Sequence, residues 1–577
     1  MALRIACTLV TITTCLGSFF GPHPHLGSRR DHPGVALRSP AMSADTLTAF
    51  DEWLEERDLL ATAKVSAARV EGFGVCLTAK EALLPGDAVL AVPRRLHITA
   101  KRAEGTELGE ALETLKITDE SVVLAMVLLE QMALGKDSEW ARYLELLPSA
   151  DELALPLLWP DAERAVLLEG SHLLGCVDAL LADLRQQWAV IEAGLVQPNP
   201  EHFPALVYRF EGFAWATAIV LSRALPFADS LALIPFLDLA NHNSGSINAC
   251  SIRVSGDATD GGAAQSEEWE LDDLSGESAA VLHPLPCYTR LPCYTHSTMP
   301  RTPNHATHPY HAAHPHCAAP LHLPPPPYQV LTMGSAHAAG EQVFIDYAGE
   351  GNWRSSWEML YTYGFVPGLL PQEWLEAGGR PLLLDGVQRD DPLHEQKVAA
   401  LVALGAEEGG AYEMWIDVKA DPKEVPDAMA PLLRLAHLGR ESAGEAAAAE
   451  GGEAAAGEAA AGEAATSELV DAAWSELVGA ASPSELVGKM AKWQAPPDEV
   501  WRAVQQRLSA ANERAVASQL VGECEAALAM LPSSEKIAER LASSESRAAL
   551  AGRVLAGERH ALEGCRAHWQ KVQSEAA

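Results

Sequence analysis

Basic and aromatic residues are both scarce in this chain of 577 residues. Lysine and arginine number 42 against 78 aspartates and glutamates, which gives a formal net charge of −36. Binding to phosphates requires clustered cations, so this acidic excess argues against a nucleic-acid partner. Aromatic residues make up only 6% of the chain, so aliphatic side chains must form most of the core. The hydrophobic share of 48% is typical of a globular protein.

Regularly spaced cysteines are lacking as well. The ten cysteines are scattered, and no C-x-x-C pair occurs. We therefore expect reduced thiols and neither a disulfide framework nor a structural metal site. Eight histidines between residues 283 and 327, some at H-x-x-H spacing, leave open a metal-binding alternative. Pro309 and Pro315 argue against a helix that would align them. The preferred interpretation is an insertion or retained intron, across about residues 283–328, that interrupts a strand–turn–strand unit.

The amino-terminal segment lacks a hydrophobic run long enough to span a membrane. The apolar stretch from Ile5 to Phe20 is too short, and basic residues follow it, with no acidic residue before Asp31. This order is typical of a two-part leader for plastids bounded by extra membranes. An ordinary secretory signal or a misassigned start codon are the alternatives. We expect a plastid location, otherwise a cytoplasmic one, and no stable membrane association of the mature protein.

Hydrophobic periodicity changes several times along the chain. Residues 65–92 alternate as strands with a turn at Leu84–Asp87, whereas 108–225 show the three- and four-residue spacing of helices. Strand-like sequence returns near residues 249–254 and 329–333, and helical spacing dominates after Pro367. The pattern predicts an α+β domain followed by a helical one.

Four motifs suggest chemistry. An apolar run from Ile234 ends in the polar pair Asn241-His242, and a second run from Gly340 ends in Tyr347. The others are Tyr363 in Tyr-Gly-Phe and the segment Glu71-Gly-Phe-Gly. Together they resemble the SET-domain protein methyltransferases, in particular those like the Rubisco large-subunit lysine methyltransferase.

The resemblance implies an α+β fold with SET-type small β-sheets and a helical insert, followed by an all-α carboxy-terminal domain. The expected divisions are a targeting leader, a catalytic domain with two insertions, and a helical substrate-binding domain with a low-complexity insert. In residue numbers these are 1–44 for the leader; 45–368 for the SET domain, with the helical insert at about 108–225 and a disordered insertion at about 255–328; and 369–577 for the helical domain, with its insert at 443–465.

The resemblance also implies S-adenosyl-L-methionine as cofactor. Glycines let a loop approach a ligand closely, an amide beside an imidazole can satisfy polar ligand groups, and a guanidinium binds a carboxylate at two points. Each motif also has a plain structural alternative: a turn glycine pair, an Asx turn, or an arginine at a helix end. The cofactor-binding positions implied are Glu71, Gly72, Phe73, Arg223, Asn241, His242 and Tyr347.

Substrate binding is implied for Arg223, Asp238, Tyr347 and Tyr363, with Tyr363 and Tyr347 as the catalytic pair. Methyl transfer needs an uncharged amine held roughly 3–3.5 Å from the methyl group, and a dry aromatic channel disfavours the ammonium form. Buried core tyrosines are the structural alternative. The sequence departs from the family at Tyr347-Ala348, where Tyr-Gly is usual, and the two tyrosines are a few residues farther apart.

The expected activity is S-adenosylmethionine-dependent protein-lysine N-methylation by a monomer acting on a protein substrate. Rubisco large subunit and plastid aldolase are candidates by analogy with the family. Histidine methylation is one alternative, although the family branch that performs it tends to lose the tyrosine that matches Tyr363. A non-catalytic SET-type protein-binding module is the other alternative.

Overall fold

The computed structural model describes the greater part of the chain from residue 44 onward, with gaps. The described residues are 44–60, 62–70, 73–227, 230–243, 250–254, 328–347, 354–368, 371–384, 387, 394, 398, 412–417, 433–434, 436–437, 510–544 and 546–575. The leader, most of the histidine-rich tract and the low-complexity segment 443–465 lie outside them.

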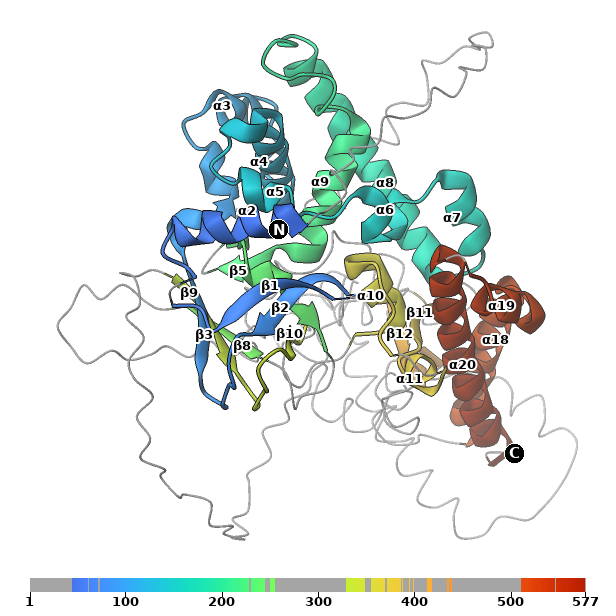
Figure 1. The fold of residues 1–577 in the computed structure, drawn as a ribbon. Coiled ribbons are helices and arrows are strands. Elements are labelled where there is room, and N and C mark those ends of the chain that lie inside the picture. Colours follow the sequence, from blue (N-terminus) through green and yellow to red (C-terminus); the bar gives the residue numbers. More distant parts are fainter. Residues whose placement is uncertain are drawn as a thin grey trace, which may run out of the picture.

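Small sheets form one side of the molecule and helices the other (Figure 1). Strands β1 and β2 form an antiparallel hairpin, and β10 and β7 extend that sheet in the order β1-β2-β10-β7. Two further sheets have the orders β3-β9-β8 and β4-β6-β5. The bounds are β1 Val65–Val70, β2 Gly74–Ala79, β3 Ala88–Pro93, β4 Ile98–Thr99, β5 Leu225–Phe227, β6 Ser230–Leu233, β7 Asn241–His242, β8 Cys250–Val254, β9 Tyr328–Met333 and β10 Gln342–Ile345.

Helices occupy the stretch between β4 and β5, where the sequence predicts a helical insert. Helix α2 (Ala44–Glu55) precedes the first strand and lies across it (Figure 1). The bounds in the insert are η2 Ala100–Ala103, α3 Glu107–Thr114, α4 Glu120–Leu134, η3 Gly135–Asp137, α5 Ala141–Leu144, α6 Ala150–Leu153, η4 Pro156–Leu158, α7 Asp161–Leu167, α8 His172–Ile191, η5 Glu192–Val196 and α9 Phe210–Arg223. The prediction of a helical insert is confirmed.

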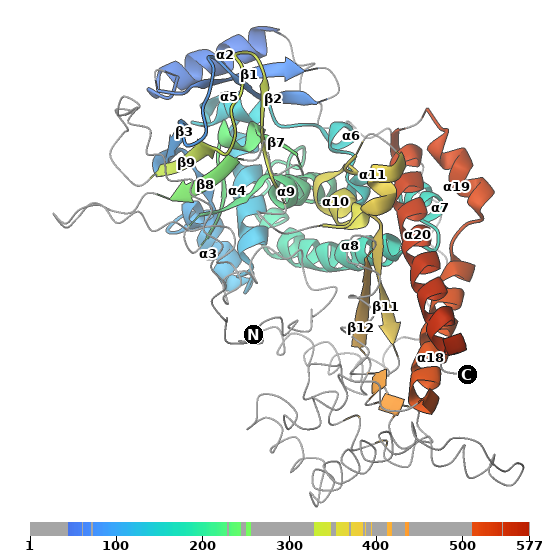
Figure 2. The same cartoon turned by 90° about the horizontal axis from the view of Figure 1, so that it is seen from below.

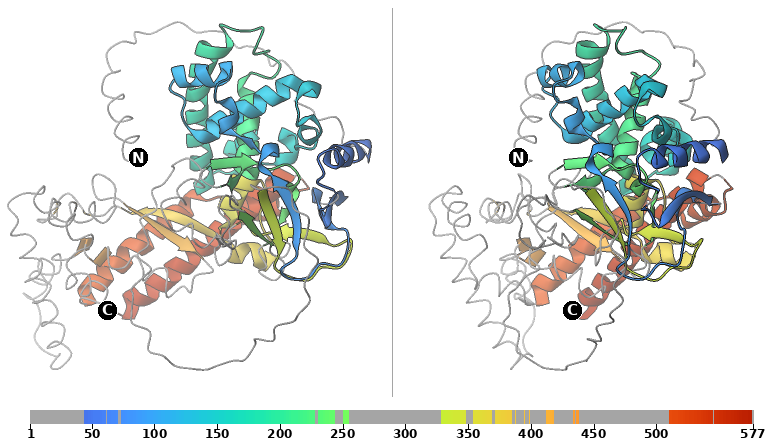
Figure 3. Two further views of the ribbon diagram at one scale, coloured as in Figure 1. Left: turned by 90° about the vertical axis from the view of Figure 1, so that its left-hand side faces the viewer. Right: turned by 60° about the vertical axis from the view of Figure 1, so that its left-hand side comes forward.

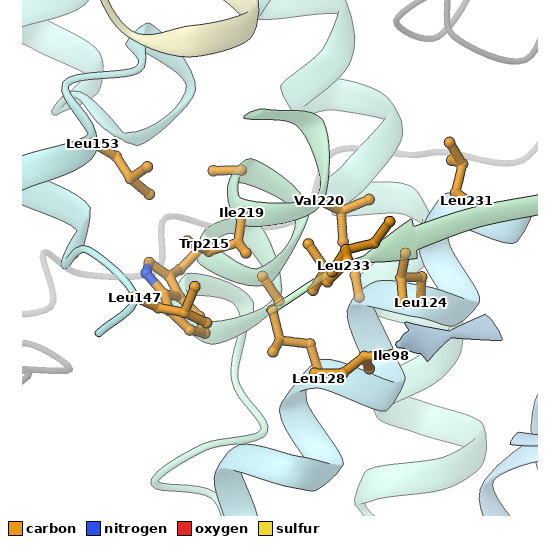
Figure 4. Packing of buried hydrophobic residues seen from close by; sticks show 14 of the residues in the cluster. Ile98, Leu124, Leu128, Leu147, Leu153, Trp215, Ile219, Val220, Leu231 and Leu233 are labelled. Carbon is orange, nitrogen blue, oxygen red and sulfur yellow. The ribbon is translucent and has the colours of Figure 1, made fainter. Parts of the chain in front are cut away.

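The core joins the insert to the sheets. Figure 4 shows α4 and α9 facing each other, with Leu128 and Val220 close to Leu233 of β6. Each of these side chains is at most 4% exposed, and Ile98 of β4 belongs to the same cluster. Burying apolar surface on this scale, at roughly 25 cal/mol per Å², is the main force that holds insert and sheets together.

The helical spacing over 108–225 gives no sign of a break near residue 170, whereas in the structure α7 ends and α8 begins there. Gly170 separates α7 from α8 with a φ of +74°, and a Cβ atom at this residue would lie 2.1 Å from the carbonyl oxygen of Met530. The Ser171 hydroxyl then accepts from the amide of Leu173 and caps the new helix. The predicted helix over 203–225 begins only at Phe210, because residues before it form turns.

Strands β8 and β9 form the two arms of a hairpin around the insertion predicted at about 255–328. Val254 pairs with Gln329, and Cys250 pairs with Met333. Tyr328, at the end of the predicted range, is part of β9 and pairs with Pro93 of β3. Residues 255–327 lie outside the described residues.

The carboxy-terminal part contains long packed helices that run side by side (Figures 2 and 3). The predicted helical carboxy-terminal domain is present, and one detail differs from the all-α prediction: β11 and β12 pair in antiparallel fashion within the same region and pack against α20. The bounds are η6 Leu237–Leu239 and α10 Ser356–Tyr363 in the site region, then α11 Pro371–Glu376, β11 Gly379–Leu384, β12 Tyr412–Asp417, α18 Ala510–Met530, α19 Ser534–Leu541 and α20 Ser546–Glu575.

Helix α20 connects this part to the helical insert. The carboxylate of Glu558, 1% exposed, accepts a hydrogen bond of 2.6 Å from Ser171 and lies 3.5 Å from the guanidinium of Arg380. Arg547 forms a second link, 2.8 Å from Glu163 of α7. The buried Glu558–Arg380 pair is costly to break, because one partner alone would remain desolvated.

Among the described helices, none has the length and apolarity needed to cross a membrane.

Candidate active site

A parallel pair of very short strands brings the two main motifs together. Strand β7 consists of Asn241 and His242, which lie opposite Phe344 and Ile345 of β10. The amide of Asn243 donates to the carbonyl oxygen of Ile345 at 3.1 Å. Residues about a hundred positions apart in the chain therefore become neighbours, and Tyr347 follows directly after β10.

Tyr347 and Tyr363 lie against each other beside this strand pair. Their ring centroids are 4.5 Å apart, and the ring of His242 lies 5.2 Å from that of Tyr347. The Tyr347 hydroxyl donates to the carbonyl oxygen of Ala240 at 2.9 Å, and the Tyr363 hydroxyl lies 3.4 Å from the carbonyl oxygen of Tyr347. Phe365 completes the aromatic cluster, 6.2 Å from Tyr363.

Helix α10 positions Tyr363. Ser355 and Glu358 form a capping box at its start, which satisfies free backbone amides there. The helix ends at Gly364, whose φ of +79° is a left-handed conformation that favours glycine. A Cβ atom at Gly364 would lie 1.9 Å from the carbonyl oxygen of Leu153, so the Tyr-Gly pair is required both by the turn and by the neighbouring chain.

The aromatic and imidazole groups of the site are neutral at physiological pH. Burial raises the pKa of Tyr347 and of Tyr363 above that of a free phenol. Burial also lowers the pKa of His242 to about 4. Nδ1 of His242 accepts from the Tyr347 amide at 3.1 Å, so its 3.6 Å approach to Asp346 is not an ion pair.

Arg223 and Asp238 meet near Tyr347. Nη1 of Arg223, at the end of α9, donates to the carbonyl oxygen of Asp238 at 3.1 Å and lies 3.8 Å from its carboxylate. Burial raises the pKa of Asp238 to about 6, and Arg223 opposes that rise. Tyr143 from α5 also donates to this carboxylate, at 2.5 Å. Sequence reasoning missed Tyr143, because helical spacing marks it only as a core residue.

The loop that carries Asp238 is backbone-strained. Phe236 has a φ of +77°, which bulky side chains rarely adopt, and its ring is fully buried, 6.0 Å from that of Phe50. Such strain persists where surrounding packing holds the conformation, and it is found often at functional sites. Here it turns the chain from β6 into η6, so that Asp238 points inward and Asn241 reaches β10.

The turn between β1 and β2 carries Phe73, the remaining predicted cofactor-binding residue among those the structure describes. Phe73 is 50% exposed, its ring lies 6.1 Å from Phe344, and its carbonyl oxygen accepts from the side-chain amide of Asn241 at 3.3 Å. A Cβ atom at Gly74 would meet nothing within 4 Å, so the space above this turn is open. Glu71 and Gly72 lie outside the described residues.

Arg354 is a second residue that sequence reasoning missed. Its Nε is buried and has no hydrogen-bond partner in the described part of the chain. Burial lowers the pKa of His242, and the positive charge of Arg354 adds to this effect. Burial raises the pKa of Tyr363, and the same charge opposes that rise, so Arg354 lies near both residues. Arg354 lies between Tyr347 and α10, outside both tyrosine motifs, so the sequence gave no sign of its role.

Within the described residues, no group of three histidines, cysteines or carboxylates is placed to hold a metal ion.

These residues fit a ligand such as S-adenosylmethionine. The half-exposed ring of Phe73 offers a flat apolar face, and Asn241 offers amide groups beside it. Arg223 and Arg354 supply cations for a carboxylate. The site therefore has an apolar face, polar amide groups and positive charge within one region.

Known proteins resemble this chain both in sequence and in fold. The family model for the Rubisco LSMT substrate-binding domain matches residues 388–562. A structure of the SET domain of LSMT bound to lysine and AdoHcy superposes with a TM-score of 0.61 over 93% of both chains, at 20% identity. This chain has the LSMT-type SET fold. The structure of Rubisco LSMT bound to sinefungin and monomethyllysine superposes with a TM-score of 0.60, again over 93% of both chains and at 20% identity.

Curated relatives match this chain over shorter stretches. The Pisum sativum Rubisco large-subunit N-methyltransferase, chloroplastic, is 29% identical over 40% of this chain and 46% of its own. The Arabidopsis thaliana fructose-bisphosphate aldolase-lysine N-methyltransferase, chloroplastic, is 27% identical over 34% and 39%. The Bos taurus N-lysine methyltransferase SETD6 is 26% identical over 36% and 49%. The match thus spans less than half of each relative.

Proposed function

We propose that this protein is an S-adenosylmethionine-dependent protein-lysine N-methyltransferase. The observation that carries the proposal is the contact of the Tyr347–Tyr363 ring pair with the Asn241-His242 segment, which places an aromatic channel element against polar ligand-binding groups. The printed names of two relatives, the aldolase-lysine N-methyltransferase and the N-lysine methyltransferase SETD6, support the same activity.

The cofactor-binding half comprises Phe73, Arg223, Asn241 and His242, with Glu71 and Gly72 carried over from the family motif. When bound, S-adenosylmethionine supplies an electrophilic methyl group on a sulfonium. His242 is neutral and therefore adds no positive charge that would repel this cation. Arg223 binds a carboxylate at two points, and Asp238 fixes its orientation through two contacts.

The acceptor-binding half comprises Arg223, Asp238, Tyr347 and Tyr363. A lysine amine must reach the methyl group uncharged, and its ammonium form is disfavoured between buried, neutral phenols. Tyr347 is held by its hydroxyl and its amide, and Tyr363 by the turn at Gly364. This rigidity keeps the amine on the axis of the breaking bond, which supplies much of the rate acceleration. The amine proton leaves to solvent.

The acceptor is a protein, and residues 369–577 are proposed to bind it, with 45–368 as the catalytic domain. The family match over residues 388–562 supports the assignment of the first region. Rubisco large subunit and plastid aldolase are the proposed acceptors, and the leader at 1–44 would direct the protein to the plastid. The chloroplastic relatives support this location.

Histidine methylation is kept as a second candidate because the Danio rerio actin-histidine N-methyltransferase is 27% identical over 38% of this chain. The presence of Tyr363 favours lysine. The two activities differ in the residue that carries the label after reaction.

Transfer of a radiolabelled methyl group from S-adenosylmethionine to plastid stromal proteins tests the proposal with the full chain. Tyr363→Phe should lower the transfer rate at least a hundredfold, since the phenol hydroxyl is lost from the site. Tyr208→Phe is the matched control, because Tyr208 is also buried but packs against Phe203 instead. Mass spectrometry then identifies the modified residue. Full transfer by Tyr363→Phe would remove the catalytic assignment, label on histidine would select the second candidate, and cofactor binding without transfer would indicate a binding module.

A further inference from the structure

Tyr143 is a buried residue with an unexplained short contact to the candidate site. It lies on α5 in the helical insert, 95 residues before Asp238, and its side chain is 0% exposed. Its hydroxyl donates a hydrogen bond of 2.5 Å to Oδ2 of Asp238. A phenylalanine would fill the same space in the core, so packing alone does not require the hydroxyl.

Asp238 depends on few partners for its charge. Its side chain is 1% exposed, and Oδ1 is buried without a hydrogen-bond partner among the described residues. Oδ2 has the Tyr143 hydroxyl at 2.5 Å and the Arg223 guanidinium at 3.8 Å. A buried carboxylate stays ionised only where donors and cations replace water, so the loss of the Tyr143 hydroxyl as a donor matters.

Arg223 depends in turn on Asp238. Its Nη1 donates to the Asp238 carbonyl oxygen and lies beside the carboxylate, and its side chain is 21% exposed. A neutral Asp238 would keep the first contact and lose the charge attraction of the second. The guanidinium would then be free to turn away from the position in which it receives a ligand carboxylate.

We infer that Tyr143 is a positioning residue for cofactor binding, which holds Asp238 as an ordered carboxylate so that Asp238 in turn fixes Arg223. The inference rests on the proposed function, since it assumes that Arg223 binds the cofactor carboxylate. Tyr143 itself touches neither cofactor nor acceptor in this arrangement.

The charged and titratable groups that face Asp238 set the pH range of this effect. They are Arg223 from α9, Tyr143 from α5, and Tyr347 after β10, whose own pKa is raised by Asp238. Burial raises the pKa of Asp238 to about 6, while Arg223 and the Tyr143 hydrogen bond lower it from what burial alone would give. Removing the hydrogen bond should therefore raise this pKa further and leave Asp238 protonated near neutral pH.

The test is the affinity of the full chain for S-adenosylhomocysteine, measured by titration calorimetry between pH 5.5 and pH 9. Wild-type affinity should fall as pH falls through about 6, where Asp238 becomes protonated. In Tyr143→Phe the midpoint should move up by about one to two pH units, the range expected when a hydrogen bond to a charged group is removed. Affinity at pH 7 should drop about tenfold and recover at pH 9.

Tyr208→Phe controls for the loss of a buried hydroxyl elsewhere and should keep the wild-type midpoint. Asp238→Asn provides a second variant if Tyr143→Phe folds poorly: its affinity should be weak and independent of pH over the same range. A wild-type midpoint in Tyr143→Phe, or wild-type pH dependence in Asp238→Asn, would overturn the inference and leave the proposed function intact. A wild-type chain that binds no cofactor at any pH would instead remove both.

Discussion

The backbone amide of Tyr347 donates a hydrogen bond of 3.1 Å to Nδ1 of His242. This bond joins His242, at the end of the run that begins at Ile234, to Tyr347, at the end of the run that begins at Gly340. Because Nδ1 is the acceptor, the ring cannot carry a proton there, and His242 is held as a neutral imidazole. The pKa of His242, lowered to about 4 by burial, agrees with this geometry.

The first prediction concerns the loss of folding stability at acidic pH. His242 has a folded-state pKa of about 4 and an unfolded value of about 6.5, so the unfolded chain binds more protons between these pH values and stability falls as pH falls through that window. At pH 5 the loss should be about 2 kcal/mol for His242 alone. Burial lowers the pKa of His97 and of His172 as well, so they add to it.

Differential scanning calorimetry from pH 7 to pH 4.5 measures this effect. His242→Gln should reduce the pH dependence of stability by the contribution of His242. An unchanged slope in His242→Gln would show that the ring is protonated without cost in the folded protein.

A second prediction has the opposite sign. The folded-state pKa of Asp238, about 6, lies above its ordinary value of 3.8, so the carboxylate lowers stability as pH rises through that window. Asp238→Asn should therefore raise the free energy of unfolding at pH 8 by about 1–2 kcal/mol while it weakens methyl transfer. Chemical denaturation at pH 8 and at pH 4 measures it, since the gain should vanish at the lower pH.

The third prediction tests the turn after Tyr363. Gly364→Ala places a Cβ atom 1.9 Å from the Leu153 carbonyl oxygen and forces alanine into positive φ, so it should destabilise the protein by about 2 kcal/mol or more. Turnover should fall too, because Tyr363 moves with the turn. Gly175→Ala in α8 is the control: nothing lies within 4 Å of its Cβ position, and helix propensity favours alanine there. Equal stability of the two variants would contradict the prediction.

The fourth prediction concerns the β8–β9 hairpin. Replacement of residues 255–327 by Asn-Gly should leave folding and methyl transfer intact. The ladder already pairs Val254 with Gln329, and the remaining connection of Asn, Gly and Tyr328 has the three-residue length and the glycine that short hairpin loops accept. Tyr328 must be kept, because it pairs with Pro93. Circular dichroism and transfer rates of the shortened chain measure the outcome. A deletion that also removes Tyr328 should be less stable, which provides the matched comparison.

Local sequence signals predicted the regular elements well. Helix α4 (Glu120–Leu134) lies within the stretch 108–225 whose spacing predicts helices, and Asp119 accepts from two backbone amides as its cap. The strands on either side of Leu84–Asp87 were also expected, because alternation and turn residues depend on near neighbours alone. The family motifs additionally indicated Asn241, His242, Tyr347 and Tyr363, which the fold brings together.

Long-range relationships were not predictable in the same way. The Tyr143–Asp238 hydrogen bond joins a short helix to a strained loop, and neither periodicity nor spacing encodes it. Strand β7 has only two residues and no alternation to detect. The strands β11 and β12 were missed because the helical composition around them dominates that part of the sequence.

The parallel pairing of β7 with β10 also bears on the order of events during synthesis. His242 leaves the ribosome 103 residues before its partner Ile345, a delay of about 5–20 s at ordinary elongation rates. Until then the polar end of the Ile234–His242 segment has no strand to pair with. The nascent chain therefore carries an unfinished sheet edge for that interval, and early chaperone binding at this segment would protect it.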